Sequence, residues 1–177
     1  MYCTNTMKIT LKNNTVANKA LEILRNRLSA GFAADNGYRR NPSQIMSDAL
    51  EVADNTIVLP EDFGCYITED VEGIMFELIQ NLAENIGENA FVVENWNQND
   101  YTDGEFEAKY ENGLLSMKHI YYPSGFGAVA NCEECGEDVV SIEEYEEGKV
   151  YVCPECGEIV DLSEYLPITT EKTVQIF

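Results

Sequence analysis

The chain has 177 residues and a net charge of −21 at pH 7, from 11 basic and 32 acidic side chains. Hydrophobic residues make up 45% of it, enough to bury a core, which excludes a mainly disordered chain. No apolar run approaches the roughly 18 residues that a membrane-spanning helix needs. The first seven residues lack the basic and apolar segments of a secretory signal. We therefore expect a folded, acidic protein in a reducing, intracellular setting.

The charge is distributed unevenly. Residues 1–40 contain seven basic and two acidic side chains, whereas residues 41–177 contain four basic and 30 acidic ones. A surface this acidic repels nucleic acid and anionic membranes, and it attracts the basic surfaces of proteins that hold nucleic acid. For the basic N-terminal part, we expect cations that face solvent or pair with acidic residues; contact with nucleic acid is the alternative.

The first elements follow simple patterns. Met7, Ile9 and Leu11 alternate with polar residues, as in a half-buried strand. Asn13, Asn14 and Thr15 supply the turn and cap for a helix that is expected to end near Ala30.

Two further helices are expected. Asn41 and Pro42 are typical of a helix start, and this helix is predicted to end near Asp54 with Ala53 on its inner face. A helix is also predicted from Thr68 to Ile86: Thr68 is placed to cap it, and apolar residues recur at intervals of three and four from Val71 to Ile86, which predicts the main helix of the core.

A β-meander follows these helices. A strand is predicted from Phe91 to Trp96, and Asp103-Gly104 is expected to turn the chain. Asn112-Gly113 is typical of a two-residue type I′ hairpin turn. This turn predicts the pairs Glu111–Leu114, Tyr110–Leu115, Ala108–Met117, Phe106–His119 and Glu107–Lys118. All apolar partners then share one face, which makes His119 a core residue rather than a catalytic one. Residues 173–177 are expected to form a last strand, which could return to the main sheet.

Two C-x-x-C-G motifs are the most specific feature of the sequence. They span Cys132–Gly136 and Cys153–Gly157, and 17 residues separate the second cysteine of the first motif from the first cysteine of the second. This spacing is typical of a four-cysteine zinc site, in which each glycine allows the turn that brings two thiolates together. The predicted ligands are Cys132, Cys135, Cys153 and Cys156. Because sulfur fills all four positions, a structural metal is expected; disulfides or free thiols are the alternative.

These motifs resemble the zinc ribbon, a small β module of transcription, translation and RNA-processing proteins. The resemblance implies one structural zinc ion and three short strands, at residues 139–140, 150–152 and 159–160. The motifs are also similar to those of rubredoxin, an iron electron carrier, so iron is the alternative metal. Many ribbons bind nucleic acid, but residues 131–165 contain 12 acidic side chains and one basic one. We therefore expect no nucleic-acid binding by this ribbon.

The patterns together predict an α+β fold, with helices packed on an antiparallel sheet and a C-terminal four-cysteine zinc ribbon. Three parts are expected. Residues 1–127 form an α+β domain of one strand, three helices and a β-meander; residues 128–166 form the ribbon; and residues 167–177 form a C-terminal strand or tail.

No pattern of a known catalytic site is present. One histidine cannot build an H-E-x-x-H metal site, and the glycine-rich patterns that bind phosphates or dinucleotides are missing. Pairs of carboxylates are no evidence of acid–base catalysis here, because 32 acidic residues in 177 produce such pairs by chance. We expect no enzymatic activity, and an unrecognised catalytic site is an alternative.

In size, acidity, mixed α+β pattern and its four cysteines, the full chain resembles the phage anti-CRISPR proteins that inhibit the type II RNA-guided nuclease. The resemblance implies a zinc-binding inhibitor that acts in the cytoplasm of a host bacterium, docks on the basic lobe of the nuclease and blocks loading of target DNA. The candidate partner-binding residues are Glu133, Glu134, Glu143, Glu144, Glu146 and Glu147. The alternative is a zinc-ribbon adaptor or regulatory subunit in transcription or RNA processing, whose basic residues 1–40 would contact nucleic acid.

Overall fold

A computed structural model describes residues 3–31, 42–59, 71–99 and 103–177. Its elements in chain order are β1 (Cys3–Leu11), α1 (Asn14–Ser29), α2 (Pro42–Ala49), β2 (Glu51–Ala53), β3 (Thr56–Leu59), α3 (Val71–Ile86), β4 (Phe91–Asn99), β5 (Asp103–Glu111), β6 (Leu114–Tyr122), β7 (Val129–Asn131), β8 (Asp138–Ser141), the 3₁₀ helix η2 (Ile142–Glu144) and β9 (Ile168–Gln175).

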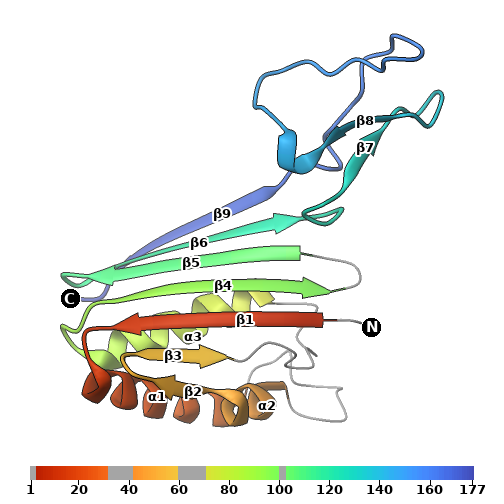
Figure 1. The fold of residues 1–177 in the computed structure, drawn as a ribbon. Coiled ribbons are helices and arrows are strands. Elements are labelled where there is room, and N and C mark those ends of the chain that lie inside the picture. Colours follow the sequence, from red (N-terminus) through yellow and green to blue (C-terminus); the bar gives the residue numbers. More distant parts are fainter. Residues whose placement is uncertain (1–2, 32–41, 60–70, 100–102) are drawn as a thin grey trace.

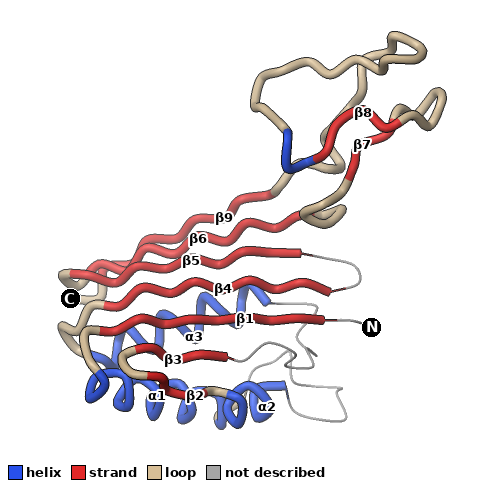
Figure 2. Tube along the Cα trace, in the orientation of Figure 1, coloured by secondary structure: helices blue, strands red, loops and turns tan. Residues whose placement is uncertain are grey.

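The main layer is a seven-stranded antiparallel sheet with the order β2-β3-β1-β4-β5-β6-β9 (Figure 1). Helices α1 and α3 lie on one face of this sheet, and α2 packs against α1. A two-stranded sheet, β7-β8, projects beyond the ends of β6 and β9 (Figure 2). The predicted fold class, helices on an antiparallel sheet with a C-terminal four-cysteine unit, is confirmed. Among the described residues no helix combines the length and apolar character that crossing a membrane requires.

The hydrophobic patterns explain how the two layers meet. Met7, Ile9 and Leu11 alternate along β1 and are buried against the helices, as their period of two predicts. Helix α1 begins where expected, because the side chain of Asn13 accepts a hydrogen bond from the N–H of Val16 at 3.0 Å. Apolar residues of α3 complete this core, and the predicted cap at Thr68 lies outside the described residues.

The hairpin of β5 and β6 is confirmed in every predicted pair. Asn112 and Gly113 have φ angles of 52° and 77°, as a type I′ turn requires. His119 is buried opposite Phe106, where the pairing had placed it.

The helix that was predicted to run to Asp54 ends at Ala49. A short hairpin follows, in which β2 pairs with β3 and Ala53 lies opposite Thr56, exposed rather than inward. Asp54 adopts a φ of 54° at the turn. Aspartate tolerates this left-handed conformation better than most residues, and that tolerance lets the chain reverse there.

Asp103 and Gly104 were expected to turn the chain, but both lie in β5 and pair with Tyr122 and Tyr121. A Cβ at position 104 would lie 3.0 Å from Nε2 of His119, so a larger residue there would require the histidine side chain to shift. The buried Asp103 accepts a hydrogen bond at 2.7 Å from the N–H of Phe126, so it supports the segment that leaves the sheet.

The last strand, β9, begins at Ile168, five residues before the predicted start. It pairs with β6 from Tyr121↔Ile168 to Leu114↔Gln175 and so forms an edge of the main sheet. The chain therefore leaves this sheet after Tyr122, builds the segment that carries the cysteines, and returns beside the strand that it left (Figure 1).

That segment has a core of its own, separate from the core under the sheet. Its buried members are Ala130, Cys132, Val140, Tyr151, Cys153, Val160 and Leu162. We call residues 128–166 the cysteine module. Where it joins the sheet, Phe126 makes edge-on ring contacts with Trp96 and Tyr122, with centroids 5.6 and 5.2 Å apart.

Gly113→Ala should lower the free energy of unfolding by about 1 kcal/mol or more, because alanine strains a left-handed backbone. The added methyl group would also meet Nε2 of Gln175 at 3.4 Å. Gly127→Ala is the matched control: position 127 lies outside the left-handed region, and its Cβ would meet only Oε1 of Glu143, at 3.9 Å. Urea unfolding followed by the fluorescence of Trp96 measures both. Equal midpoints for the two variants would contradict this account of the turn.

Stability should also fall at high pH through Tyr122. Burial raises the pKa of Tyr122 to about 12, and the nearby charge of Glu105, which accepts its hydrogen bond at 3.3 Å, adds to the rise. The unfolded pKa is about 10, so the folded state holds this proton more tightly and loses that advantage as pH rises from about 10 to about 12. Unfolding free energies at about pH 9 and about pH 11 should therefore differ more in the unmodified protein than in Tyr122→Phe. The same difference in both proteins would rule out this contribution.

Candidate metal centre

Each C-x-x-C-G motif folds into a tight turn, here called a knuckle. In the first knuckle the N–H of Gly136 donates to the carbonyl of Cys132 at 2.7 Å, and the N–H of Cys132 donates to the carbonyl of Glu137 at 2.8 Å. Gly136 has a φ of 77°, a left-handed conformation that other residues adopt with strain. The glycine after the second cysteine is thus a requirement of the turn.

The second knuckle repeats this geometry. Gly157 donates to the carbonyl of Cys153 at 3.0 Å, Cys153 donates to the carbonyl of Glu158 at 2.8 Å, and the φ of Gly157 is 79°. Because both knuckles have the same bonds, they present their cysteines in the same way. Their supports differ: β7 and β8 flank the first, whereas a single bridge between Val152 and Ile159 flanks the second. The sequence had predicted three short strands and had missed β7.

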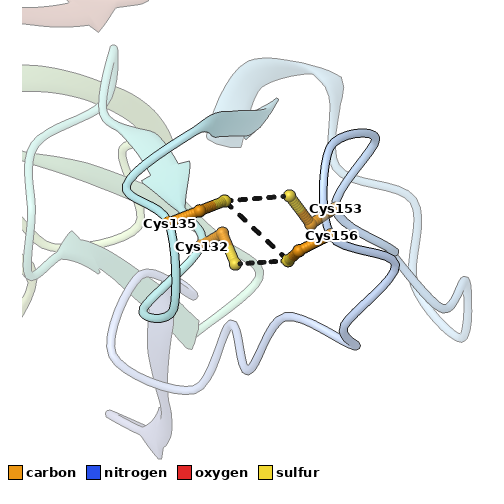
Figure 3. A group of neighbouring side chains, drawn as sticks. All are labelled: Cys132, Cys135, Cys153 and Cys156. Carbon is orange, nitrogen blue, oxygen red and sulfur yellow. Dashed lines mark hydrogen bonds between the residues drawn. The ribbon is translucent and has the colours of Figure 1, made fainter.

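The four thiols converge on one point (Figure 3). The Sγ atom of Cys132 lies 3.5 Å from that of Cys156, and the Sγ atom of Cys135 lies 3.4 Å from Cys153 and 3.8 Å from Cys156. All four sulfur atoms lie within 4.8 Å of one another, and no disulfide joins them. A tetrahedron with metal–sulfur bonds of about 2.3 Å has edges of about 3.8 Å. The donor set therefore fits one four-coordinate metal ion.

The knuckle amides act on the charge of these sulfur atoms. Hydrogen bonds from the backbone of Cys156 and Glu155 lower the pKa of Cys153 to about 7, although burial opposes this. At Cys135 the Glu137 amide acts in the same direction, but hydrogen bonds among the crowded thiols and desolvation raise the pKa to about 12. Cysteine ligands bind a metal as thiolates, so metal binding at this site would release the protons of these thiols.

The two cysteines of each knuckle differ in their burial. The first cysteine of each motif, Cys132 or Cys153, is buried in the core of the module, and the second, Cys135 or Cys156, is exposed. The site thus lies at the surface, but four protein sulfurs leave no open position for substrate or water. Such a closed set supports a structural role rather than catalysis.

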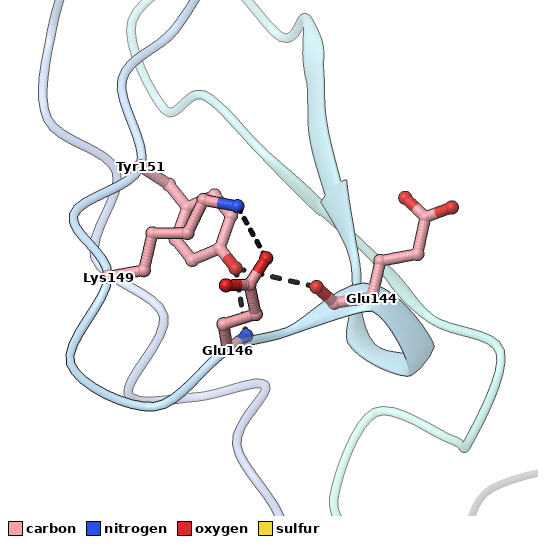
Figure 4. Close-up of polar contacts among 4 residues, drawn as sticks. All are labelled: Glu144, Glu146, Lys149 and Tyr151. Carbon is pink, nitrogen blue, oxygen red and sulfur yellow. Dashed lines mark hydrogen bonds and ion pairs between the residues drawn. The ribbon is translucent and has the colours of Figure 1, made fainter.

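Carboxylates surround the metal centre. All twelve acidic residues between Asn131 and Tyr165 are exposed. The single cation among them, Lys149, donates to Oε1 of Glu146 at 2.8 Å and lies 5.2 Å from the ring centroid of Tyr151 (Figure 4). The positive charge is therefore used within the module, and the module's outer surface remains negative.

The candidate partner-binding residues occupy different places on this surface. Glu133 and Glu134 belong to the first knuckle, and Glu133 lines a small hollow with Asp161 and Glu164. Glu143 and Glu144 lie in η2. Glu146 and Glu147 lie in the loop that follows. The structure thus forms two acidic groups rather than one.

Tyr151 organises the second acidic group, a role that the sequence pattern did not indicate. Its hydroxyl accepts a hydrogen bond from the N–H of Glu146 at 2.9 Å and donates to the carbonyl of Glu144 at 3.4 Å (Figure 4). An aromatic residue between two valines resembles an ordinary strand residue. Only the folded chain shows that its hydroxyl holds the acidic loop.

Cys153→Ser should abolish metal binding and unfold the cysteine module, because structural zinc supplies about 10–16 kcal/mol in comparable small units. The separate core under the main sheet should persist, since it contains no residue of the knuckles. Metal content by elemental analysis and the unfolding signal of Trp96 measure the two effects. Cys65→Ser, the same chemical change outside both motifs, is the control. Unchanged metal content in Cys153→Ser would refute the ligand assignment.

No protein-family model, curated protein or solved structure matches this chain. The chain's own geometry is that of an α+β protein with a four-cysteine group positioned to bind one metal ion.

Proposed function

We propose that the protein is a non-enzymatic inhibitor that binds a basic nucleic-acid-handling protein through its acidic surface. The observation that carries the proposal is the exposure of all twelve acidic side chains of the module, together with the internal use of Lys149. A surface of this kind attracts proteins that hold nucleic acid and repels nucleic acid itself. The module would act as a rigid carrier of negative charge.

Zinc is the metal that we propose for the centre. Four thiolates in a closed tetrahedral set are typical of structural zinc, and they add about two negative charges to the module when zinc is bound. Iron is the alternative that the same ligands allow. Elemental analysis should find one zinc ion per chain and a colourless protein; visible absorption with stoichiometric iron would overturn the assignment.

The cations of α1 donate to groups of the protein itself, although Lys19 and Arg25 remain exposed. Arg25 donates to the carbonyls of Ser47 and Leu50, which end helix α2, at 3.3 and 2.8 Å. Lys19 donates to the carbonyl of Ile86 at the end of α3, at 3.3 Å.

Arg27, the third cation of α1, donates to the carbonyl of Gly31 at 2.8 Å and pairs with Glu77. Cations at the carbonyl ends of helices satisfy groups that the helix itself leaves unbonded. The expectation that these cations face solvent or pair with acidic residues holds: Lys19 and Arg25 are exposed, and Arg27 pairs with Glu77. Each also donates to a main-chain carbonyl. This use of their donors supports the inhibitor over the adaptor.

The most specific partner that we propose is the type II CRISPR nuclease. This nuclease holds its guide–target heteroduplex in a positively charged channel, which is a suitable electrostatic partner. The carboxylates of the module would cover that basic surface and prevent target DNA from loading. Within the described ranges the four cysteines are the one cluster suited to a metal ion, and their closed set supports a structural role for that ion.

The decisive experiment measures loading of target DNA by the guide-bound nuclease as the protein is added. Loading should fall to background at saturating protein, and free DNA or RNA at low salt should show no mobility shift. If the nuclease still loads DNA at saturation, the proposed partner is wrong. A salt-sensitive shift of free nucleic acid would instead favour the zinc-ribbon adaptor.

Charge-reversal variants test which acidic surface of the protein inhibits the nuclease. Changing Glu143, Glu144 and Glu147 to lysine should weaken inhibition about tenfold or more and reduce its salt dependence. Glu146 is left unchanged because it holds Lys149. The control reverses three exposed glutamates of the other domain, Glu22, Glu51 and Glu84, which changes the net charge equally. Equal loss in both triple variants would show that net charge, not the acidic loop, is responsible.

A further inference from the structure

The second knuckle carries an exposed apolar surface that the metal centre does not require. Val150, Val152 and Ile159 are 66%, 49% and 71% exposed. They are neighbours, because Val152 is paired with Ile159 in a β-bridge and Val150 lies two residues away on the same segment. None belongs to the buried core of the module. Grouped exposure of large apolar side chains is typical of interaction sites.

A cavity of about 440 Å³ lies beside this surface. Val150 and Ile159 line it, and Tyr145, Leu162 and Leu166 provide further apolar walls. The apolar surface is thus hollowed, so it offers an entering side chain contacts on several sides. Burial of one aliphatic side chain in such a hollow stabilises a complex by an amount that exposed charges rarely reach.

Negative charge borders the hollow. Asp161 lines it, and Glu146 lies on the loop that Tyr151 holds in place. Lys149 also lines the hollow and pairs with Glu146, so the lining itself has one carboxylate and one cation. The excess of negative charge belongs to the module around the hollow, whose twelve acidic residues are all exposed. An apolar hollow on so acidic a module favours an apolar side chain that has basic neighbours.

We infer that the hollow beside Val150 and Ile159 is the anchor point for a basic segment of the partner protein, in which one large apolar side chain is flanked by lysine or arginine. This inference rests on the proposed function for the class of partner. A second copy of the chain is a poor occupant, because each copy carries a net charge of −21. Charge would bring the basic segment to the module, and the apolar side chain would then hold it.

The inference can be tested with short peptides and the full-length, metal-loaded protein. The probes are N-acetylated, C-amidated peptides of sequence Arg-Arg-Leu-Arg-Arg and Arg-Arg-Ser-Arg-Arg, titrated while amide chemical shifts are recorded. The leucine peptide should bind about tenfold more tightly than the serine peptide, with shifts concentrated between residues 145 and 166. Equal affinities, or equal shifts over the whole acidic surface, would overturn the inference.

Two variants locate the anchor point. Ile159→Ser and Val150→Ser should each remove most of the difference between the two peptides, and both positions are exposed enough to leave the fold intact. Ile168→Ser on β9 is the matched control, since Ile168 is 57% exposed but lies outside the hollow. Metal content and amide shifts outside the module report correct folding. A full leucine preference in both module variants would overturn the inference.

The nuclease assay separates this inference from the proposed function. If the unmodified protein blocks DNA loading and Ile159→Ser blocks it equally well, the inhibitor function stands and the anchor point is wrong. If the nuclease is unaffected while the leucine preference is present and depends on Ile159, the anchor point stands and the partner is another basic protein.

Discussion

The cysteine module depends on the convergence of four sulfur atoms. The module has twelve exposed carboxylates and a single cation, Lys149, which is paired with Glu146. Repulsion among the carboxylates therefore opposes a compact form. The module's own core is small, and two of its seven buried residues are cysteines. A metal ion bound by all four sulfur atoms would join the two halves of the module through its metal–sulfur bonds, and these bonds would oppose the repulsion even though a four-thiolate zinc centre itself adds negative charge. Such a centre would allow so small a unit to present so much negative charge.

Local chemistry made several features predictable. The Asn112-Gly113 turn determined a full hairpin register, and the two glycines after the cysteines marked both knuckles, because each needs a left-handed backbone. The prediction was wrong where a residue typical of a turn is explained by a contact with a residue farther along the chain. Gly104 resembled a turn glycine, yet it lies in β5, where the side chain of His119 approaches the backbone. The acidic loop was evident from composition, but the support that Tyr151 gives to it depends on a fold that no local pattern describes.

The basic residues show why net charge by segment is a weak guide to function. Residues 1–40 carry a positive excess, which raised the possibility of nucleic-acid contact. Within α1, however, Lys19 and Arg25 donate to carbonyls at the ends of the two other helices. These cations connect three helices on one face of the sheet. Lys19 and Arg25 remain exposed, but their hydrogen bonds to these carbonyls give them a role in the fold that the count of charges does not indicate.

The return of the chain as β9 beside β6 has a consequence for the order of folding. Residues 123–167 separate two strands that are neighbours in the sheet, and closing so long a loop costs conformational entropy before any strand pairing is gained. Metal binding by the two knuckles would bring distant parts of this loop together and shorten the flexible chain that must be closed. The pairing of β9 with β6 is therefore the part of the sheet that metal binding would favour, since β1 to β6 do not enclose this loop. Availability of metal during synthesis would then determine how long the edge of β6 stays open to other chains.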